Sequence, residues 1–265
     1  MEGAAALTQA LLASDWHYFA AGARVIDVGP ARLGFLPQLQ HLNAGCVAFV
    51  DAPETTHDVG WLDELETTVR QIGNATSRLY TVGKSASLEA ALRNRGYQAR
   101  TEIGYLQHDL NHSSDIELSQ IETGADWRSK LQLHQFDDKC PDGYHVPAIQ
   151  WVSVEQRKVA AAYMNSFLAK RNGTICGSVS LAMVGELARL KNIYVHPNHR
   201  RQSVAKGIVK AVFSMAADLG AQAVGCFAVA DDIGQRLYES CGMERVAELN
   251  EWSRELEMIG ERRAA

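Results

Sequence analysis

The chain has 265 residues, of which 46% are hydrophobic and 22% are charged, and its formal net charge at pH 7 is −5. This composition excludes an intrinsically disordered chain, a collagen-like repeat and a small disulfide-rich protein. The net charge also argues against a protein that recruits nucleic acid or anionic lipid through a global basic field.

The sequence carries no sign of a membrane span or a secretory leader. No uninterrupted apolar run reaches the roughly 20 residues that a transmembrane helix needs, and the first residues lack the basic region of a signal peptide. The 5 cysteines are odd in number and include no C-x-x-C pair. Reduced thiols in a cytoplasmic compartment are the simplest interpretation. We therefore expect a cytoplasmic protein that does not associate with membranes.

The N-terminal half gives weak secondary-structure signals. An apolar run at 46–50 predicts a strand, and a second strand is predicted at 78–82. A helix over 87–95 is expected to end at Gly96, because glycine readily adopts the left-handed conformation that ends helices. A strand over 101–110 follows.

The C-terminal half gives sharper signals. Alternating apolar and polar residues indicate strands, and apolar residues in steps of three or four indicate helices. A strand, a crossover helix and a further strand in succession imply a parallel pair with a right-handed connection. The predicted strands are 116–121, 165–170, 174–184, 187–195, 223–229 and 245–256, and the predicted helices are 126–136, 154–163, 202–219 and 233–240.

The two halves end alike, which indicates an internal duplication. When Gly96 is placed on Gly242, the helix end, the strand start and the strand end of both halves match without a gap. The alternative is that any two connections from a helix to a strand look alike. We predict an α/β chain with mixed sheets and two domains, 1–112 and 113–265.

A basic turn between a predicted strand and the long helix after it carries the clearest chemical signal. Arg200 and Arg201 lie in this turn, and the small residues Ser203 and Ala205 follow at the start of the helix. The first amides of a helix have no intrahelical partner and carry partial positive charge, so they attract anions. Arginines can add charge-assisted hydrogen bonds. The segment therefore predicts a phosphate-binding site.

This turn resembles the signature of the GNAT superfamily of acyl-CoA-dependent N-acyltransferases. The family pattern Arg/Gln-x-x-Gly-x-Gly/Ala corresponds to Arg200-x-x-Ser203-x-Ala205, with serine in place of the first glycine. The downstream Leu-Tyr-x-x-x-Gly pattern of the family corresponds to Leu237, Tyr238 and Gly242. The resemblance covers roughly residues 115 to 256. It implies tandem GNAT-like domains, each a twisted, mostly antiparallel sheet with a central parallel strand pair that splays for CoA.

The resemblance further implies acetyl-CoA as co-substrate and no metal. The pantetheine arm would pair with the backbone at Ile193 and Val195, and the diphosphate would lie on the amides of the basic turn. Lys206 and Lys210, one helical turn apart, would face either the outer phosphates or solvent. The residues assigned to the coenzyme in this way are Ile193, Val195, Arg200, Arg201, Gln202, Ser203, Val204, Ala205, Lys206, Asp231 and Gly234.

For the reaction, the resemblance implies direct attack of an amine on the thioester within a ternary complex. A backbone N–H near Val195 would stabilise the oxyanion that forms. Tyr238 would protonate the departing thiolate, because the ordinary pKa of tyrosine lies near that of a thiol. The alternative for Tyr238 is a half-buried helix tyrosine without a catalytic role.

The general base is marked less clearly. Family members often carry a glutamate on the fourth strand, but Arg189 occupies that place here, and Glu186 at the start of the strand is the nearest carboxylate. His196 and His199 in the basic turn are alternatives. Cys226 could form an acyl-cysteine, but a small buried core residue is the simpler interpretation.

The acyl acceptor is expected at the loop 137–147, which carries several acidic residues and so suits an amine. Asp138, Tyr144 and His145 are the residues that we assign to the acceptor, although an ordinary solvated loop explains the acids equally well. The N-terminal half lacks the corresponding catalytic residue, since Leu92 stands at the position that corresponds to Tyr238. It is therefore expected to be a degenerate copy.

These features predict an N-acetyltransferase that acts on a primary amine of a small molecule or peptide. One alternative is transfer of an aminoacyl group from charged tRNA, against which the net charge argues. Another is a non-catalytic acyl-CoA sensor, suggested by Ser203 and the missing glutamate. The sequence leaves open the acceptor, the acyl chain length and the oligomeric state, a homodimer included.

Overall fold

The computed structural model describes residues 2–55, 58–135 and 147–257. The chain divides into two compact units. Unit 1 comprises residues 1–15 and 103–247, and unit 2 comprises residues 16–102 and 248–265. Each unit therefore takes segments from both of the sequence domains expected at 1–112 and 113–265, and the boundary at residue 112 stays a prediction.

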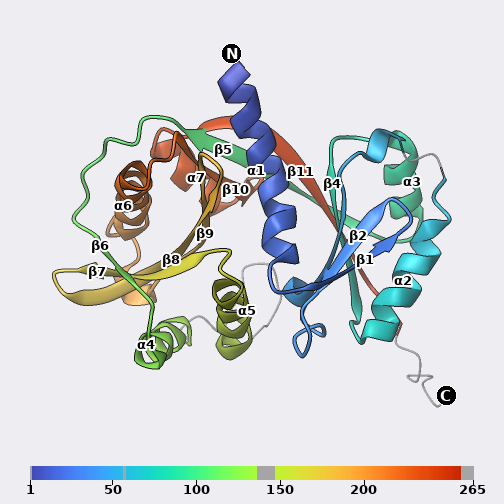
Figure 1. The fold of residues 1–265 in the computed structure, drawn as a ribbon, viewed down its shortest axis with the longest axis horizontal. Helices are drawn as coiled ribbons and strands as arrows, with labels where there is room; N and C mark the ends of the chain where they lie inside the picture. The colour runs from blue at the N-terminus through green and yellow to red at the C-terminus, as the bar shows by residue number, and fades with distance from the viewer. Residues whose placement is uncertain (1, 56–57, 136–146, 258–265) are drawn as a thin grey trace. The chain divides into compact units, whose positions relative to one another are not determined.

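Unit 1 combines a mixed sheet with helices on both of its faces. Its strands are β5 (Gln98–Gln107, whose second half lies here), β6 (Glu117–Gln120), β7 (Asn165–Arg171), β8 (Thr174–Val184), β9 (Leu187–Val195) and β10 (Ala223–Val229). Its helices are α4 (Gly124–His134), α5 (Ala148–Ala160), α6 (Val204–Asp218) and α7 (Ile233–Ser240). The strand order is β5-β10-β9-β8-β7-β6 (Figure 1). The order of elements predicted for the C-terminal half is confirmed, although α5 begins at Ala148 rather than at Val154.

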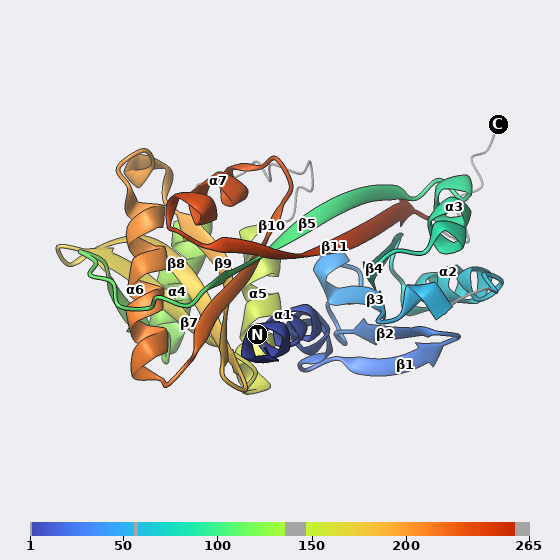
Figure 2. The same ribbon diagram turned by 90° about the horizontal axis from the view of Figure 1, so that it is seen from above.

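The two faces of the unit 1 sheet differ in polarity, as the alternation along β7 shows. Phe167 and Ala169 point into the apolar cluster that α6 covers. Ser166 points to the opposite face, where its hydroxyl accepts a hydrogen bond of 2.7 Å from Lys130 of α4. Figure 2 shows α6 and α5 on opposite sides of β8 and β9. One face is therefore an aliphatic core, and the other holds a polar network.

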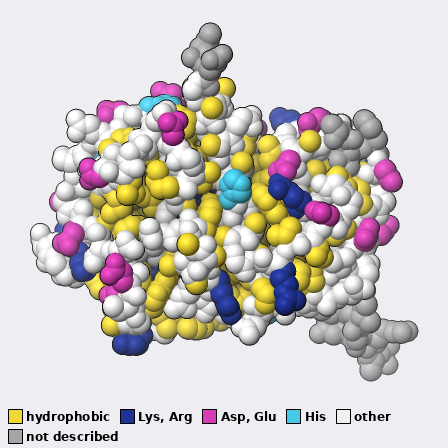
Figure 3. Space-filling model, in the orientation of Figure 1, with side chains coloured by type: hydrophobic (Ala, Val, Ile, Leu, Met, Phe, Trp, Pro, Cys, Tyr) yellow, Lys and Arg dark blue, Asp and Glu magenta, His cyan; other side chains and the backbone are white. Residues whose placement is uncertain are grey.

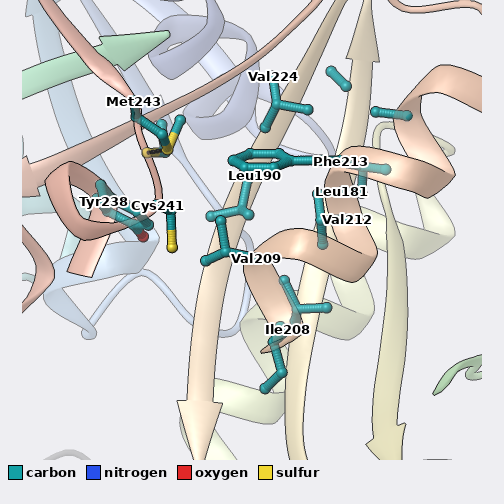
Figure 4. Close-up of a cluster of buried hydrophobic side chains, with 14 of the residues drawn as sticks. Leu181, Leu190, Ile208, Val209, Val212, Phe213, Val224, Tyr238, Cys241 and Met243 are labelled. Carbon is teal, nitrogen blue, oxygen red and sulfur yellow. Dashed lines mark hydrogen bonds between the residues drawn. The ribbon is translucent and has the colours of Figure 1, made fainter. Parts of the chain in front are cut away.

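The aliphatic core of unit 1 is built on one face of α6, as the spacing of its apolar residues predicts. The side chains of Ile208, Val209, Val212 and Phe213 are fully buried and contact residues of β8, β9 and β10. Figure 4 shows these side chains together with Tyr238, Cys241 and Met243, which come from α7 and the segment after it.

Unit 2 also contains parallel and antiparallel strand pairs, and its strands follow the order β1-β2-β3-β4-β11-β5 within the 11-stranded sheet of the chain. Its strands are β1 (Arg24–Val28), β2 (Ala31–Phe35), β3 (Cys46–Val50), β4 (Thr76–Val82), β11 (Glu244–Glu255) and the first half of β5. Its helices are α2 (Trp61–Ile72), α3 (Ala86–Asn94) and the short 3-10 helices Asn43–Gly45 and Pro53–Thr55, while α1 (Glu2–Ala20) contributes residues to both units. Strand β3 is parallel to β4, and β11 is antiparallel to β4. The C-terminal strand of the chain thus completes the sheet that the N-terminal half begins.

The same succession of elements occurs twice along the chain. Strand, helix, strand, helix and strand appear as β3-α2-β4-α3-β5 and again as β9-α6-β10-α7-β11. In both copies the first two strands are parallel. The glycines that were aligned from the sequence, Gly96 and Gly242, both have φ of 83°. This agreement supports the predicted duplication.

None of the helices in the described part of the chain combines the length and the apolar character needed to cross a bilayer.

Candidate active site

The parallel strands β9 and β10 of unit 1 separate toward their carboxyl ends. They pair over only three residues each, from Leu187 with Ala223 to Arg189 with Gly225. Strand β9 then continues to Val195, and β10 continues to Val229. The unpaired ends form the wedge that was predicted for the pantetheine arm. In open α/β sheets, ligands bind at the carboxyl ends of such diverging strands.

A β-bulge interrupts the pairing of β9 with β8 inside this wedge. Tyr194 pairs with Ser178 and Lys191 pairs with Ser180, so Asn192 and Ile193 together oppose a single residue of β8. Asn192 adopts a left-handed conformation with φ of 55°. An extra residue in one strand leaves backbone groups out of the ladder. The bulge thereby leaves the backbone near Ile193 out of the regular ladder, two residues before Val195, near which the oxyanion donor was expected.

The basic turn after β9 is open to solvent and presents backbone amides. Arg201 and Ser203 both have φ of 59°, and their side chains are exposed. Two left-handed residues so close together direct neighbouring amides to one side, which is the geometry of an anion-binding nest. The first helical hydrogen bond of α6 runs from Gly207 N–H to Ser203 C=O, so the amides before Gly207 have no intrahelical partner.

Arg200 has a different role from the one expected. Its backbone N–H donates to Pro197 C=O at 3.2 Å, and its Nε donates to Val195 C=O at 3.1 Å. Its guanidinium lies 5.8 Å from the ring centroid of Tyr194. Arg200 therefore links the turn to the end of β9 through hydrogen bonds. The backbone amides that can bind an anion begin at Arg201. The remaining members of the predicted set follow in order, namely Gln202, Ser203, Val204, Ala205 and Lys206.

Replacing Ser203 with glycine is expected to stabilise the protein. Ser203 has φ of 59° and ψ of 15°, a region that costs a residue with a Cβ about 1 kcal/mol or more and costs glycine nothing comparable. A gain of about 1 kcal/mol corresponds to a rise in Tm of about 2–4 °C for a protein of this size. Differential scanning calorimetry measures the shift. A Tm that is unchanged or lower would contradict a strained turn.

Tyr238 of α7 is buried beside Cys226 of β10. Burial raises the pKa of Tyr238 well above its ordinary value, and the neighbouring Cys226 raises it further. Cys226 directly follows Gly225, the last residue of β10 that pairs with β9, so it stands where the two strands begin to separate. In Figure 4, Tyr238 and Cys241 lie next to each other at one side of the cluster. The thiol of Cys226 is fully buried, and burial raises its pKa to about 12, which fits a core residue rather than a nucleophile.

Asp231 and Gly234 follow the carboxyl end of β10, at the edge of the sheet where the basic turn follows β9. Asp231 has φ of 63°, and its N–H donates to the side chain of Gln235 at 2.9 Å. A Cβ on Gly234 would lie 3.3 Å from the Cβ of Ala228, so the glycine lets α7 pack closely on β10. These positions support the predicted location beside the wedge.

Arg189, at the place of the family's glutamate, takes part in a buried ion cluster. Its Nη2 donates to Asp15 of α1 at 2.9 Å, and its Nε donates to Ser14 Oγ at 2.9 Å. Lys191 Nζ lies 2.6 Å from the same carboxylate. Burial alone raises the pKa of Asp15, but the charges of Lys191 and Arg189 outweigh it and lower the pKa below its ordinary value. A carboxylate held in this way is a structural counter-ion and a poor proton acceptor.

The structure does not bring Glu186 to this site. Glu186 is exposed in the turn between β8 and β9, at the opposite end of β9 from Val195. At roughly 3.3 Å per residue, nine residues of strand separate the two ends by roughly 30 Å. This position at the far end of β9 from the basic turn does not support Glu186 as the base, and its assignment stays a prediction.

Three residues on the polar face of the sheet form a cluster that was not predicted. The ring of His134, in α4, stacks on Tyr194 with centroids 4.2 Å apart, and its Nε2 lies 3.1 Å from Ser178 Oγ. Burial, and then the charge of Lys130, lowers the pKa of His134 to about 3, so the ring is neutral at physiological pH. No local pattern marks a single histidine at the end of a helix, and its partners lie 44 or more residues away in the sequence.

The expected acceptor residues Asp138, Tyr144 and His145 lie outside the described residues, so their assignment stays a prediction. Among the residues that the structure describes, no three His, Cys, Asp or Glu side chains come together as metal ligands would.

Unit 2 has the same order of elements but no comparable site. Strands β3 and β4 stay paired up to Val50, the last residue of β3, so no wedge opens between them. The first turn of α2 carries Asp63 and Glu64, which would repel a phosphate. Both features support the prediction of a degenerate copy.

Comparison with known proteins agrees with this geometry. Residues 129–243 match the model of the Acetyltransferase (GNAT) family. A functionally unknown conserved protein from Staphylococcus epidermidis is similar with a TM-score of 0.68 and 14% identity, over 94% of this chain and 100% of that chain. A GCN5-related N-acetyltransferase from Sphaerobacter thermophilus is similar with a TM-score of 0.61 and 16% identity, over 85% and 76% of the two chains. No curated protein matches the chain.

A tandem GNAT protein from the clavulanic acid biosynthesis pathway is also similar, with a TM-score of 0.54 and 12% identity, over 85% of this chain and 78% of that chain. At such low identities, these solved structures establish a shared fold and nothing finer. The family match is independent of them, and its residues contain both the wedge between β9 and β10 and the amide-lined turn. Over residues 129–243, the chain is similar to the acetyltransferase (GNAT) family.

Proposed function

We propose that this protein is an N-acetyltransferase that transfers the acetyl group of acetyl-CoA to a primary amine of a small molecule or peptide. The observation that carries the proposal is the open turn at Arg201 to Lys206. This turn follows β9, one of the two strands that form the wedge. A diphosphate bound on those amides places the pantetheine arm along the unpaired edge of β9, beside Ile193 and Val195.

In the proposed reaction, the amine attacks the thioester carbonyl directly. The bulge at Asn192 frees backbone groups of β9 next to the bound acyl group. An N–H from this segment would stabilise the oxyanion of the tetrahedral intermediate, which is commonly the largest single contribution to such catalysis. Tyr238 would then donate its proton to the sulfur as the C–S bond breaks.

The acceptor would approach from the polar face of the sheet. His134 and Tyr194 lie on that face beside the bulge, and α4 ends at His134, directly before the stretch that holds the predicted acceptor residues. A neutral imidazole can hydrogen-bond an incoming amine without repelling it. We assign to His134 the positioning of the acceptor rather than proton abstraction, because a pKa of about 3 makes it a weak base.

The coenzyme site is tested by a matched pair of charge changes. Gln202→Glu places a carboxylate in the turn, and Gln222→Glu makes the same change at an exposed position in the turn before β10. Repulsion of the diphosphate is expected to weaken CoA binding about tenfold or more in Gln202→Glu, which corresponds to about 1.4 kcal/mol. Gln222→Glu should leave the affinity unchanged. Isothermal titration calorimetry measures both, and equal effects of the two variants would argue against the turn as the diphosphate site.

The reaction itself is tested by thiol release from acetyl-CoA in the presence of amines, polyamines, amino acids and aminoglycosides. We expect saturable release of free thiol with at least one amine. CoA binding without release by any acceptor would favour a sensor. Salt-sensitive retention of tRNA would favour aminoacyl transfer, which needs many phosphate contacts. Lys and Arg are scattered among acidic side chains on the face drawn in Figure 3, where the described residues form no continuous basic stripe.

A further inference from the structure

The hydroxyl of Ser178 is enclosed on the polar face of the unit 1 sheet and has one hydrogen-bond partner. None of the surface of Ser178 is exposed. Its Oγ lies 3.1 Å from His134 Nε2, and no second partner of this hydroxyl occurs among the described residues. A buried donor that lacks an acceptor is costly, so buried hydroxyls place their hydrogen on an available acceptor. The hydroxyl of Ser178 therefore donates to His134 Nε2.

The direction of this hydrogen bond fixes the tautomer of His134. Burial, and then the charge of Lys130, lowers the pKa of His134 to about 3, so the ring is neutral at physiological pH. A neutral imidazole carries its hydrogen on one ring nitrogen, and its other nitrogen is an acceptor. Because Nε2 accepts from Ser178, the ring hydrogen lies on Nδ1. His134 is therefore a hydrogen-bond donor through Nδ1.

This Nδ1–H is available to a ligand beside the wedge. His134 is half-buried, and its Nδ1 is not sealed from solvent and has no hydrogen-bond partner in the part of the chain that the structure describes. The ring is held in place by its stacking on Tyr194, with centroids 4.2 Å apart and planes inclined by 25°. Tyr194 directly follows the β-bulge of β9. The donor thus has a defined position next to the strand segment where the reaction is proposed.

The chemistry of the donor favours an oxygen of the acyl acceptor as its partner. An amine nitrogen that accepted this N–H would lose the lone pair that it needs to attack the thioester. Lys130 lies one helical turn before His134, and its ammonium pairs with Glu155 and donates to Ser166. A ring N–H close to an ammonium attracts atoms of negative partial charge. Carbonyl and carboxylate oxygens meet both conditions.

We propose that His134 Nδ1 donates a hydrogen bond to a carbonyl or carboxylate oxygen of the acyl acceptor, and that Ser178 is the positioning residue that fixes the required tautomer. The inference rests on the proposed function. It specifies the acceptor as an amine that carries such an oxygen close to its nitrogen, which is the chemistry of amino acids and of peptide N-termini.

The tautomer is tested on the protein alone, by long-range 15N–1H correlation of its histidine side chains. The signals of His134 are those that disappear in His134→Phe. In the wild type the hydrogen-bearing nitrogen should be Nδ1, and in Ser178→Ala it should become Nε2, which an unconstrained imidazole favours. Ser180→Ala is the matched control, since Ser180 is equally buried in β8 and its hydroxyl donates to Ser166 at 3.2 Å. A hydrogen on Nε2 in the wild type would overturn the proposal.

The acceptor oxygen is tested by thiol release from acetyl-CoA with glycine, glycinamide and ethylamine, of which ethylamine lacks the oxygen. Rates are expressed per concentration of unprotonated amine, which removes the difference in basicity. Wild-type kcat/KM should be at least about tenfold higher for glycine or glycinamide than for ethylamine. The better of these two acceptors tells whether a carboxylate or a neutral carbonyl is bound.

The variants assign this preference to the two residues. Ser178→Ala should reduce the preference about three- to tenfold, mainly through KM, and Ser178→Thr should restore it, because it keeps the hydroxyl. His134→Phe keeps an aromatic ring on Tyr194 but removes the donor, so it should lose the preference.

Two results would overturn the proposal while leaving the acetyltransferase intact. One is equal wild-type kcat/KM for the three acceptors, and the other is an equal loss of preference in Ser180→Ala. Absence of thiol release with every amine would instead overturn the proposed function, and the role of His134 in binding an acceptor with it.

Discussion

Replacing Asp15 with alanine is expected to lower the free energy of unfolding by about 3–5 kcal/mol, the usual loss when one partner of a buried ion pair is removed. Arg189 is 2% exposed, and Asp15 is 1% exposed. Without the carboxylate, the guanidinium and Lys191 would remain close together with no anion between them. Urea denaturation followed by circular dichroism measures the loss.

The control for this variant is an ion pair at the surface. Glu89 and Arg93 form an i,i+4 pair on α3, and the Arg93 side chain is 60% exposed. Glu89→Ala should cost no more than about 0.5 kcal/mol, because exposed pairs contribute little. Losses of similar size in the two variants would contradict a special role for the buried cluster.

The contribution of Asp15 should also depend on pH in one direction. Its pKa is lower in the folded state than in the unfolded state, so its stabilising effect is complete above the unfolded value of about 3.9. The effect is lost as the pH falls through the folded value. The stability difference between wild type and Asp15→Ala should therefore be constant from about pH 5 to 8 and shrink in more acidic solution.

The sequence predicted the elements whose apolar residues are regularly spaced. Strands β7 to β10 and helix α6 have this regularity, and their predicted bounds lie within two residues of the observed ones. Helix α1 was missed because its apolar residues do not gather on one face, and β1 was missed because most of its residues are exposed. Helix α2 could have been found, since Leu62, Leu65 and Val69 repeat at helical spacing and are all buried.

In the candidate site, features set by consecutive residues could be predicted, whereas contacts between residues far apart in the sequence could not. The anion turn could be predicted because a few consecutive residues determine a backbone conformation and expose its amides. The ion cluster could not, since Asp15 and Arg189 lie 174 residues apart and nothing in the sequence pairs them. The stacking of His134 on Tyr194 escaped prediction for the same reason. Glu186 lies in the turn before β9, at the opposite end of that strand from the basic turn, and its role stays a prediction.

The second large effect is expected for Tyr238→Phe, which should lower kcat by about 10²- to 10⁴-fold, as loss of a general acid commonly does. The change removes only the hydroxyl, and the ring keeps its contacts in the apolar cluster. The affinity for CoA should be retained. Burial raises the pKa of Tyr238, so the hydroxyl stays protonated, and kcat of the wild type should not fall as the pH rises to about 10.

A neighbouring tyrosine provides the matched control for this variant. The ring of Tyr105 lies 5.9 Å from that of Tyr238, and its hydroxyl donates to Glu239 at 3.1 Å, away from Cys226. Tyr105→Phe makes the same chemical change in the same cluster. It should leave kcat within about threefold of wild type, because the Tyr105 hydroxyl donates its proton to Glu239 and takes no part in the proposed reaction. Stopped assays of thiol release with each variant measure the contrast. Equal losses of kcat would attribute the effect to packing around α7, and full activity of Tyr238→Phe would remove Tyr238 from the reaction.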